Sequence, residues 1–541
     1  TLPATLGMGA MFPLTLRLFA VSGATIGDDV GRVYASNTLG SILGAWIPGF
    51  ILMPRYGMQA ALFAGMALNF AMALMLLVVA AADPEPTAAK PEGDDPEGTP
   101  PAPVSEARAS HAVIESILIY ALAPIIPALV ALVYFGLFRP NAPWFVPNLT
   151  WDPGRMTLGV FRPSVARSAC RELANTHVEL LYYHDGLSTT VTVERYWGTH
   201  LAMKNNGKVD ASNGEDMPTQ INLAAYPLLM HQDGPEGLDV AVIGFGSGVT
   251  VGTALHFPVR SVDVIELERA VPEAARWFAE YSHLDFPLES FPYVDMERLE
   301  VINDDGRNYL AATEREYDVI ISEPSNPWIT GVADLFTEEH FRISKRRLRE
   351  GGIYCQWVQL YELSPENIKA IYRTFASQFE HVVALSADDF SPDTVLMGSD
   401  SPLPLDLGRV VRGFAHEGAQ ADLRAGTLHR PHDVFSRVLL ASREEVMQFS
   451  QIEYTRDTAS APWVAHADSD NARPCNLPLC RREPVPTNTD DNMLIEFAAP
   501  RDLIGYQRYE RYLPDHLYAP TWPYGNVVGK VASVEGQVFA K

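Results

Sequence analysis

The sequence has little of several residue types, and each scarcity narrows the class of protein. Four cysteines in 541 residues are too few for a disulfide-rich scaffold, and they lack a paired metal-ligand spacing, so no metal site is expected. The cysteines are Cys170, Cys355, Cys475 and Cys480. The last two leave open a local disulfide or half of a zinc site.

Basic residues are also scarce, since 41 Lys and Arg stand against 66 Asp and Glu, a formal net charge of -25. Nucleic acid is therefore not an expected partner.

Charged residues are absent from four long stretches in the N-terminal part of the chain. The uncharged stretches are residues 1–16, 33–54, 56–82 and 116–138. About 20 apolar residues suffice to cross a bilayer, so we expect four transmembrane helices, with buried core helices as the alternative. The chain begins without Met and without the basic start of a signal peptide, so we expect the first helix to be truncated.

The segment between the third and fourth expected helices has a different composition. Residues 83–111 are rich in Pro, Ala and acidic residues, which predicts a disordered loop. Basic residues near the helices are divided almost evenly between the two sides, so the positive-inside rule leaves the orientation open. We expect three helices within 1–82, a fourth within 112–138 and a connector over 139–181. No acid lies within the uncharged stretches, which gives a transporter little support.

A glycine-rich turn follows a short apolar strand in the second part of the chain. Residues 238–249 read LDVAVIGFGSGV, a buried strand followed by Gly244, Gly246 and Gly248 and the start of a helix. Glycines let the backbone lie against a ligand and let the N-terminus of the helix face it. The next strand places Glu266 about twenty residues on, where an acid accepts hydrogen bonds from ribose hydroxyls. This spacing favours a nucleotide-binding site.

Two further apolar strands carry acids at or just beyond their carboxyl ends. Asp305 follows one strand and Glu323 follows the next. Because ligands bind beyond the carboxyl ends of parallel strands, both acids are predicted to line one crevice with Gly246 and Glu266. The alternative for any one acid is that it caps a helix or faces solvent. A dinucleotide enzyme ranks lower, because its glycine fingerprint requires Gly or Ala where Val249 stands.

Beyond these patterns, a series of motifs occurs in a fixed order. The motifs are YHDG (183–186), NNGKVDAS (205–212), DMPTQ (216–220), VIGFGSG (242–248), VIELE (264–268), NDDGRNYL (303–310), SEPSNPWITGVADLFTEEHF (322–341) and GGIYCQWVQ (351–359). Together they resemble the polyamine aminopropyltransferases of the spermidine synthase family, and in particular its membrane-fused bacterial members, from about residue 182 to about residue 398. Residues 31–57 resemble the membrane part of the same fused proteins.

The resemblance implies an α/β fold, a Rossmann-like, methyltransferase-type doubly wound sheet with a small N-terminal β lid, preceded by transmembrane α-helices. The implied domains are a lid over 182–230, a nucleotide-binding catalytic domain over 231–400, an extension of it over 401–500 and a tail over 501–541. It further implies a transferase of polyamine biosynthesis at the bacterial cytoplasmic membrane, with the catalytic domain in the cytoplasm. The co-substrate would be decarboxylated S-adenosylmethionine or S-adenosylmethionine. The expected partners are an amine acceptor, the lipid bilayer, and either further copies of the chain or subunits of a membrane complex.

The resemblance also assigns roles to individual residues. The implied nucleotide-binding residues are Gly244, Gly246, Ser247, Gly248, Glu266, Asp305 and Gly306. Among them, Glu266 would hold the ribose and Asp305 would contact the adenine amino group. Glu323 aligns with the catalytic aspartate of the family, and we expect it to be the base that deprotonates the acceptor amine. The implied acceptor-binding residues are Thr219, Gln220, Asn326 and Trp328.

Besides Glu323, three of these positions depart from the family pattern. Ser247 stands where an Asp grips the aminopropyl ammonium group, Asn326 stands where the motif D-x-x-D-P has its second Asp, and Thr219 replaces a Tyr. A buried ammonium group without a carboxylate partner is costly, so these changes remove negative charge from the place where a diamine would bind. Two alternatives stay open: an S-adenosylmethionine-dependent methyltransferase, which Ser247 favours, and a catalytically inactive nucleotide-binding or scaffold subunit.

Two segments near the C-terminus carry weaker signals. Residues 487–497, TNTDDNMLIEF, resemble a segment near the end of the fused relatives. Asp490 and Asp491 within it are either substrate ligands or part of a polar turn before a strand, and the turn is the favoured interpretation. Residues 527–538 alternate between apolar and polar in the manner of strands and indicate the start of a further β module.

Overall fold

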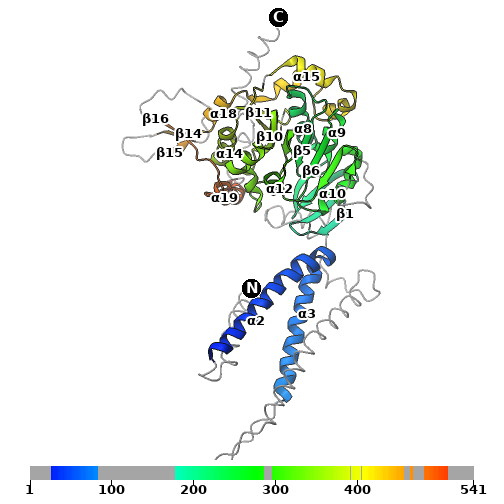
Figure 1. The fold of residues 1–541 in the computed structure, drawn as a ribbon, viewed down its shortest axis with the longest axis vertical. Coiled ribbons are helices and arrows are strands. Elements are labelled where there is room, and N and C mark those ends of the chain that lie inside the picture. The colour runs from blue at the N-terminus through cyan, green and yellow to red at the C-terminus, as the bar shows by residue number, and fades with distance from the viewer. Residues whose placement is uncertain are drawn as a thin grey trace, which may run out of the picture. The chain divides into compact units, whose positions relative to one another are not determined.

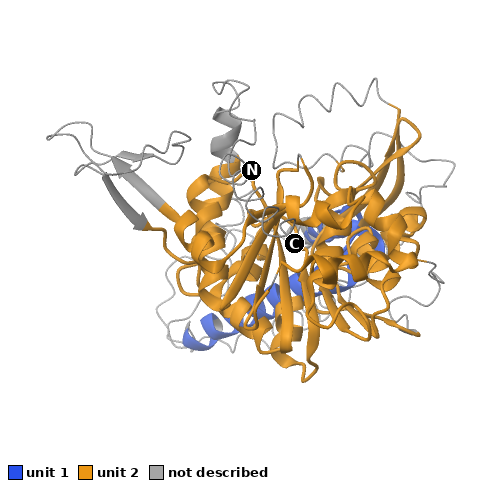
Figure 2. Cartoon of the chain, turned by 90° about the horizontal axis from the view of Figure 1, so that it is seen from above, with its two compact units in different colours: residues 1–155, 185–187 blue, residues 156–184, 188–541 orange. Residues whose placement is uncertain are grey.

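The computed structural model, drawn in Figure 1, describes most of the chain between residues 26 and 509. The described residues are 26–82, 157, 177–284, 295–389, 391–403, 405–455, 464–466 and 480–509. The chain divides into two compact units, coloured separately in Figure 2: residues 1–155 with 185–187, and residues 156–184 with 188–541. Several expected features lie outside the described residues. They are the uncharged stretches 1–16 and 116–138, the acidic loop over 83–111, Cys170, Cys475 and the segment 527–538.

The described part of the first unit is helical. Helix α2 (Ile26–Ile47) leads through a π-helical turn (Pro48–Leu52) into α3 (Met53–Ala82), which is kinked at Gly57, where φ is +81°. The two helices overlap the second and third uncharged stretches, although α2 begins seven residues before the second stretch and includes Asp28, Asp29 and Arg32. Within the described residues, Val30–Leu52 is the one helical stretch that passes a length and apolarity test for crossing a membrane, and none of that stretch is buried. The multi-pass arrangement stays a prediction.

The second unit contains a small antiparallel sheet in the range expected for the β lid. Its strands follow the order β1 (Val178–Asp185), β2 (Thr190–Tyr196), β3 (His200–Asn205) and β4 (Lys208–Ser212). Helix α8 (Met217–Met230), which the expected range of the lid included, is almost entirely buried and belongs to the core of the large sheet instead. The antiparallel lid therefore ends with β4, because α8 is buried on nearly all sides and its apolar residues pack into the core.

In the described part of this unit, nine strands form the large sheet, in the order β13-β11-β12-β10-β9-β5-β6-β8-β7. The strands are β5 (Asp239–Ile243), β6 (Ser261–Ile265), β7 (Asp295–Met296), β8 (Leu299–Ile302), β9 (Tyr317–Ser322), β10 (Leu348–Gln359), β11 (His381–Ser386), β12 (Asp393–Ser399) and β13 (Val438–Leu440). The five strands from β8 to β10 in this order are parallel, and the outer strands are antiparallel. The chain runs from β5 outward to β8 and then returns to β9. The direction of winding thus reverses between β5 and β9, which is where open α/β sheets bind ligands.

Helices cover both faces of the large sheet, as Figure 1 shows. One face packs on α8, α9 (Val249–His256) and α10 (Ala270–Ala275), and the other on α12 (Gly306–Ala312), α13 (Glu338–Lys345) and α14 (Pro365–Gln378). Successive residues of β5 alternate between the two cores, with Val240 and Val242 in one and Ala241 and Ile243 in the other. Because both faces are buried, the strands are continuous apolar runs, as expected for a doubly wound sheet. The predicted α/β sheet is confirmed.

The region after residue 400 is built onto this domain. Its elements are α15 (Leu407–Phe414), α16 (Gln420–Ala425), α17 (Pro431–Ser436), α18 (Arg443–Phe449), β14 (Gln451–Thr455), β15 (Val464–His466), β16 (Cys480–Pro484) and α19 (Leu494–Tyr509). The segment after residue 493 was predicted as a strand, and this is wrong. It is helix α19, because Ile495, Ala499 and Leu503 are buried at a spacing of four residues, which one face of a helix provides.

Candidate active site

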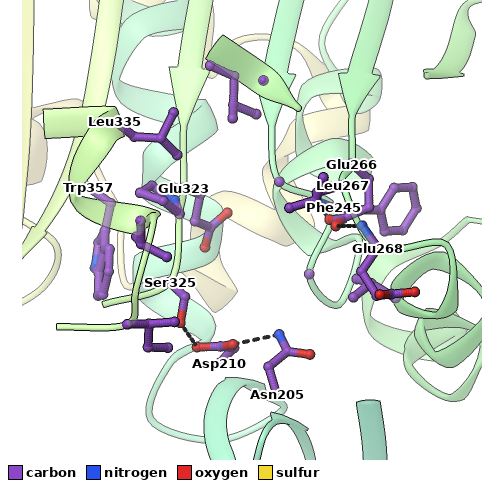
Figure 3. A pocket seen from close by; sticks show the side chains of 18 of the residues that line it. Asn205, Asp210, Phe245, Glu266, Leu267, Glu268, Glu323, Ser325, Leu335 and Trp357 are labelled. Atoms are coloured by element: carbon purple, nitrogen blue, oxygen red, sulfur yellow. Dashed lines mark hydrogen bonds between the residues drawn. The ribbon is translucent and has the colours of Figure 1, made fainter. Parts of the chain in front are cut away.

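A cavity of about 830 Å³ lies at the carboxyl ends of the parallel strands, next to the point where the winding reverses. Its walls include the turn after β5, the residues that follow β6, β8, β9 and β10, the first residues of α8 and β12, and residues of the small antiparallel sheet around β4. Figure 3 shows Glu323 between Trp357 on one side and Glu266 on the other. The sequence predicted a crevice at this edge of the sheet, and the structure brings Gly246, Glu266, Asp305 and Glu323 together there.

The turn after β5 needs glycine for its conformation and for its close approach to the end of β9. Gly244, Gly246 and Gly248 all have positive φ, of 94°, 52° and 82°. A Cβ atom on Gly244 would lie 2.7 Å from the carbonyl oxygen of Glu323, so a larger residue would push these two segments apart. Gly244, Gly246 and Ser247 line the cavity, whereas Gly248 lies behind the turn at the start of α9.

Glu266 braces this turn as well as lining the cavity. Its Oε2 accepts a hydrogen bond from the backbone N–H of Phe245 and its Oε1 from that of Glu268, both at 2.8 Å. Burial raises the pKa of the Glu266 carboxyl to about 7, although the two backbone donors favour the charged form. Each carboxylate oxygen keeps a further lone pair for a ligand hydroxyl. Glu266 could therefore contact a ribose, as predicted, while it also holds the backbone of the turn.

Asp305 also combines two roles. It precedes α12 and its side chain accepts a hydrogen bond from the backbone N–H of Asn308 at 2.8 Å, which is a helix cap. It lines the cavity together with Gly306, the first residue of α12. A Cβ atom on Gly306 would lie 2.4 Å from Cγ2 of Ile243, so glycine lets α12 pack closely against β5. The sequence offered helix capping and nucleotide binding as alternatives for this residue. The structure shows that one side chain can cap the helix and still line the cavity.

Glu323 follows the last residue of β9, and its carboxylate faces the cavity (Figure 3). The hydroxyl of Thr250 donates a hydrogen bond to its Oε2 at 2.5 Å. Burial raises the pKa of the Glu323 carboxyl to about 8, and the negative charge of Asp216 adds to this effect. Among the described residues, no Lys or Arg forms an ion pair with this carboxylate. A carboxyl with a pKa in this range can exchange a proton near neutral pH, which is what a general base requires.

The first turn of α8 connects the glycine turn to the other wall. The amide of Gln220 donates to the backbone carbonyl of Ser212 at 3.0 Å, and its oxygen accepts a short hydrogen bond from the hydroxyl of Ser247. The hydroxyl of Thr219 donates to Oδ2 of Asp393 at 3.1 Å. Both predicted residues of this turn line the cavity, and each is already committed to a protein partner.

The other two predicted acceptor-binding residues lie outside the cavity wall. Asn326 is fully buried, and its amide atoms make no hydrogen bond of acceptable geometry within the described residues, although the side chain lies near the Tyr361 hydroxyl. Trp328 is buried in the core between the sheet and the helices on the α12 side. Neither residue lines the cavity, so their predicted contact with the acceptor would need a movement of the loop after β9.

The cavity is strongly acidic. The acids that line it are Asp210, Asp216, Glu266, Glu268, Asp305, Glu323, Asp334, Asp393 and Asp490. Its two basic residues within the described part of the chain are Lys208 and Arg307, and each is already paired with an acid, Lys208 with Asp210 and Arg307 with Asp490. Most of the carboxylates therefore have no cation as a partner. Such a cavity favours a positively charged ligand.

Comparison with known families agrees with this geometry. Residues 219–387 match the model of the spermine/spermidine synthase domain, a range that includes the glycine turn and every cavity strand end from β5 to β10. The chain carries a domain of the spermidine synthase family. This spermidine synthase domain is aminopropyltransferase-like, as the motif order predicted.

Several proteins are similar to the spermidine synthase domain. A polyamine aminopropyltransferase of Korarchaeum cryptofilum is 29% identical over 188 residues, which are 34% of this chain and 55% of the relative. A spermidine synthase of Dictyostelium discoideum is 27% identical over 196 residues, 36% of this chain and 63% of the relative. A solved spermidine synthase from Thermotoga maritima is 19% identical and matches 46% of this chain and 88% of its own, with a TM-score of 0.34. The chain thus spans little more than half the length of the first two.

The cavity also has lining residues that the sequence did not single out, and some of them lie outside residues 219–387. Asp216 precedes α8, Trp357 lies near the end of β10, Tyr361 follows that strand, and Asp393 begins β12. Asp490, for which a turn was the favoured interpretation, lines the cavity and pairs with Arg307. Asp216 could have been found, since it belongs to the DMPTQ motif. Asp393 could not, because its position depends on the pairing of distant strands.

Proposed function

We propose that the spermidine synthase domain transfers the aminopropyl group of decarboxylated S-adenosylmethionine to an amine acceptor. The observation that carries the proposal is the set of cavity carboxylates without a cation partner, centred on Glu323 beside the glycine turn. Desolvating a charge without a partner is costly, and a cationic substrate removes that cost when it binds. Both substrates of this reaction are cations, a sulfonium with an amino group and an amine.

The nucleotide would lie across the ends of β5, β6 and β8. There the turn at Gly244 and Gly246 approaches the ligand closely, Glu266 faces the ribose and Asp305 faces the adenine. Because the basic residues of the cavity already form ion pairs with acids of the protein, the cavity favours the decarboxylated nucleotide. S-adenosylmethionine carries a carboxylate, and the cavity cations Lys208 and Arg307 are already paired with acids of the protein. A ligand without that carboxylate avoids repulsion from the acidic wall.

The chemistry needs little more than alignment and one proton acceptor. The lone pair of the acceptor nitrogen attacks the methylene carbon next to the sulfonium, a C–N bond forms, and the C–S bond breaks with its electron pair left on sulfur as a neutral thioether. Glu323 takes the proton that the nitrogen must lose. Its hydrogen bond with Thr250 fixes the direction of the carboxylate, so that the base is already in place when the acceptor binds.

The proposal extends to the first unit, which we propose anchors the domain to a bacterial cytoplasmic membrane. Support comes from the apolar stretch Val30–Leu52 and from the exposure of large apolar side chains on α2 and α3. The amine acceptor would then be modified close to the membrane surface.

Titration calorimetry of the purified full-length chain with both nucleotides tests the proposal, followed by turnover assays with a panel of amines. We expect tighter binding of decarboxylated S-adenosylmethionine and formation of its thioether product together with an aminopropylated amine. Preference for S-adenosylmethionine with methyl transfer would replace the proposal by the methyltransferase alternative. Nucleotide binding without turnover of any amine, together with co-purifying subunits, would favour an inactive scaffold subunit. If the protein binds neither nucleotide nor the thioether product of either, the hypothesis that it is an enzyme of this kind is wrong.

A further inference from the structure

The loop between β9 and α13 forms one long wall of the cavity. Residues 324–325, 329–332 and 334–335 of this loop line the cavity. The middle of the loop is less buried than its ends, since Thr330 and Gly331 are exposed whereas 326–328 and 336–337 are buried. We call residues 329–332 the loop tip. Because the tip is only partly buried, its position depends on polar contacts as well as on packing.

A segment from the C-terminal region crosses this loop. Residues 487–496, which we call the strap, lie beyond the matched spermidine synthase domain. The side-chain amide of Asn488 donates to the backbone carbonyl of Phe336, and the backbone carbonyl of Asn488 accepts from the N–H of Glu338, both at 3.0 Å. The N–H of Asn488 donates to the hydroxyl of Thr374 at 2.8 Å. Asn488 is 1% exposed, so it is a buried anchor between the strap and the base of the loop.

The turn after this anchor has a strained backbone. Met493 has a φ of +43°, which is unfavourable for a residue with a Cβ atom, and it lines the cavity. The side-chain oxygen of Asn492 accepts hydrogen bonds from the N–H groups of Thr489 and Leu494, both at 3.0 Å. Its amide donates to the carbonyl of Thr487 at 2.8 Å. Such strain persists only where the surroundings determine the conformation, so the strap is a well-defined element.

Further contacts join the strap to the exposed part of the loop. The carboxylate of Glu496 accepts a bifurcated hydrogen bond from the N–H of Gly331, at 3.4 Å to Oε1 and 3.3 Å to Oε2. Asp490 pairs with Arg307, whose guanidinium also donates to the backbone carbonyl of Asp334 at 3.2 Å. All of these groups are partly or fully exposed, and exposed charged contacts are weak. The strap thus combines a buried anchor at the base of the loop with weak contacts near its tip.

We propose that the strap is a latch for the loop tip: Glu496 holds the tip over the nucleotide end of the cavity, and the nucleotide enters and leaves when this contact breaks. The flank of the tip lies at that end, because Asp334 is bonded by Arg307, in the first turn of α12 beside Asp305. Glu496 does not line the cavity, so it is a positioning residue that acts through Gly331. That the ligand is a nucleotide rests on the proposed function, whereas the latch rests on contacts within the protein.

The test compares Glu496→Ala with Asp491→Ala in the full-length chain. Asp491 belongs to the same strap, is exposed and lies outside the cavity wall, so the two variants lose the same charge. Hydrogen exchange in the ligand-free protein is measured first. Peptides that cover the loop tip should exchange about two- to tenfold faster in Glu496→Ala, because one hydrogen bond to a charged group is lost. They should exchange at the wild-type rate in Asp491→Ala.

Nucleotide exchange is then followed by stopped-flow tryptophan fluorescence with decarboxylated S-adenosylmethionine and with S-adenosylmethionine, since Trp357 lines the cavity. The latch contact exists without a ligand, so Glu496→Ala should raise the association and dissociation rate constants by the same factor of about two to ten and leave Kd nearly unchanged. A merely structural role would raise the dissociation rate constant and Kd alone.

Three outcomes separate the latch from the proposed function. Unchanged hydrogen exchange at the loop tip in Glu496→Ala would overturn the latch. Faster exchange at the tip with an unchanged association rate constant would show that the tip does not control entry, which also overturns it. Faster exchange at the tip in a chain that binds neither nucleotide would contradict the proposed function and leave the contact between strap and loop established.

Discussion

At the scale of single residues, the site depends on where one carboxylate is placed. The resemblance aligns Glu323 with a family aspartate, which is one methylene group shorter, and the hydroxyl of Thr250 donates a hydrogen bond to Oε2 of Glu323. The carbonyl oxygen of the same residue lies against Gly244, which leaves no room for a Cβ there. The backbone of Glu323 is thus held by its contact with Gly244, and its carboxylate by the hydrogen bond from Thr250.

Replacing this base should separate binding from chemistry. Glu323→Gln keeps the shape of the side chain and removes its ability to accept a proton, so turnover should fall about 100- to 10,000-fold. Nucleotide affinity, measured by calorimetry, should stay within about twofold. Glu280→Gln on the exposed surface of α11 (Ala279–Ser282) serves as the control and should behave like the wild type. Near-full turnover of Glu323→Gln with an accepted amine would show that another group takes the proton.

The same substitution should change how stability depends on pH. The pKa of Glu323 in the folded, ligand-free protein, about 8, lies above its value of about 4.3 in an unfolded chain. A raised pKa gives stability that is fully present below the unfolded value and is lost as the pH rises to about 8. The Gln variant resembles the protonated form, so its advantage over the wild type should grow from about pH 5 to about pH 8, by on the order of 2 to 4 kcal/mol. Thermal unfolding at pH 5, 7 and 9 measures this, and a constant difference would contradict it.

At the scale of elements, the start of α12 serves two purposes that one substitution can separate. Asp305→Ala removes the helix cap, worth about 0.5 to 2 kcal/mol of stability, together with a carboxylate that lines the cavity and is proposed to contact the nucleotide. Asp305→Ser keeps a capping oxygen and removes the carboxylate. We therefore expect the Ser variant to be as stable as the wild type and to bind nucleotide about 1 to 3 kcal/mol more weakly. Acceptor KM at saturating nucleotide should hardly change. Normal nucleotide affinity in Asp305→Ser would show that the adenine lies elsewhere.

The elements that the sequence predicted best are those fixed by local patterns. The parallel strands are short apolar runs bounded by glycine or acidic residues, and this pattern placed Glu266, Asp305 and Glu323 at one edge of the sheet. The turn after β5 was predictable because its three glycines are needed for positive φ. Helix α19 was mistaken for a strand, since its buried positions become clear only when the segment is packed on the domain.

Residues brought in by distant pairing could not be predicted in this way. Asp393 reaches the cavity through the register of β10 with β12, and Thr219 meets it across 174 residues of sequence. The sequence predicted that charge was lost where Ser247 and Asn326 depart from the family pattern. The structure places carboxylates from other elements around the same cavity. The cavity is assembled from the ends of several strands, and no local sequence pattern specifies which strands will be neighbours.

At the scale of the whole molecule, the two units differ in whether their large apolar side chains are buried or exposed. In the second unit the large apolar residues form two buried cores on the faces of the sheet. In the first unit many of them are exposed, among them Leu39 at 59%, Trp46 at 53% and Phe50 at 65%. Contiguous exposed apolar surface on a helix long enough to cross a bilayer indicates contact with lipid or with other helices.

This contrast predicts that the full-length chain is an integral membrane protein. After expression in bacteria it should sediment with membranes, resist extraction at high salt and alkaline pH, and dissolve in detergent, because the apolar surface of α2 would otherwise face water. A charge near the middle of a spanning helix costs about 2.5 to 3.5 kcal/mol on insertion scales, so Ile42→Lys should reduce the membrane-bound fraction. Val411→Lys, at an exposed apolar position of α15, is the matched control and should leave that fraction unchanged. Recovery of the wild type in the soluble fraction without detergent would show instead that these helices are covered within a protein assembly.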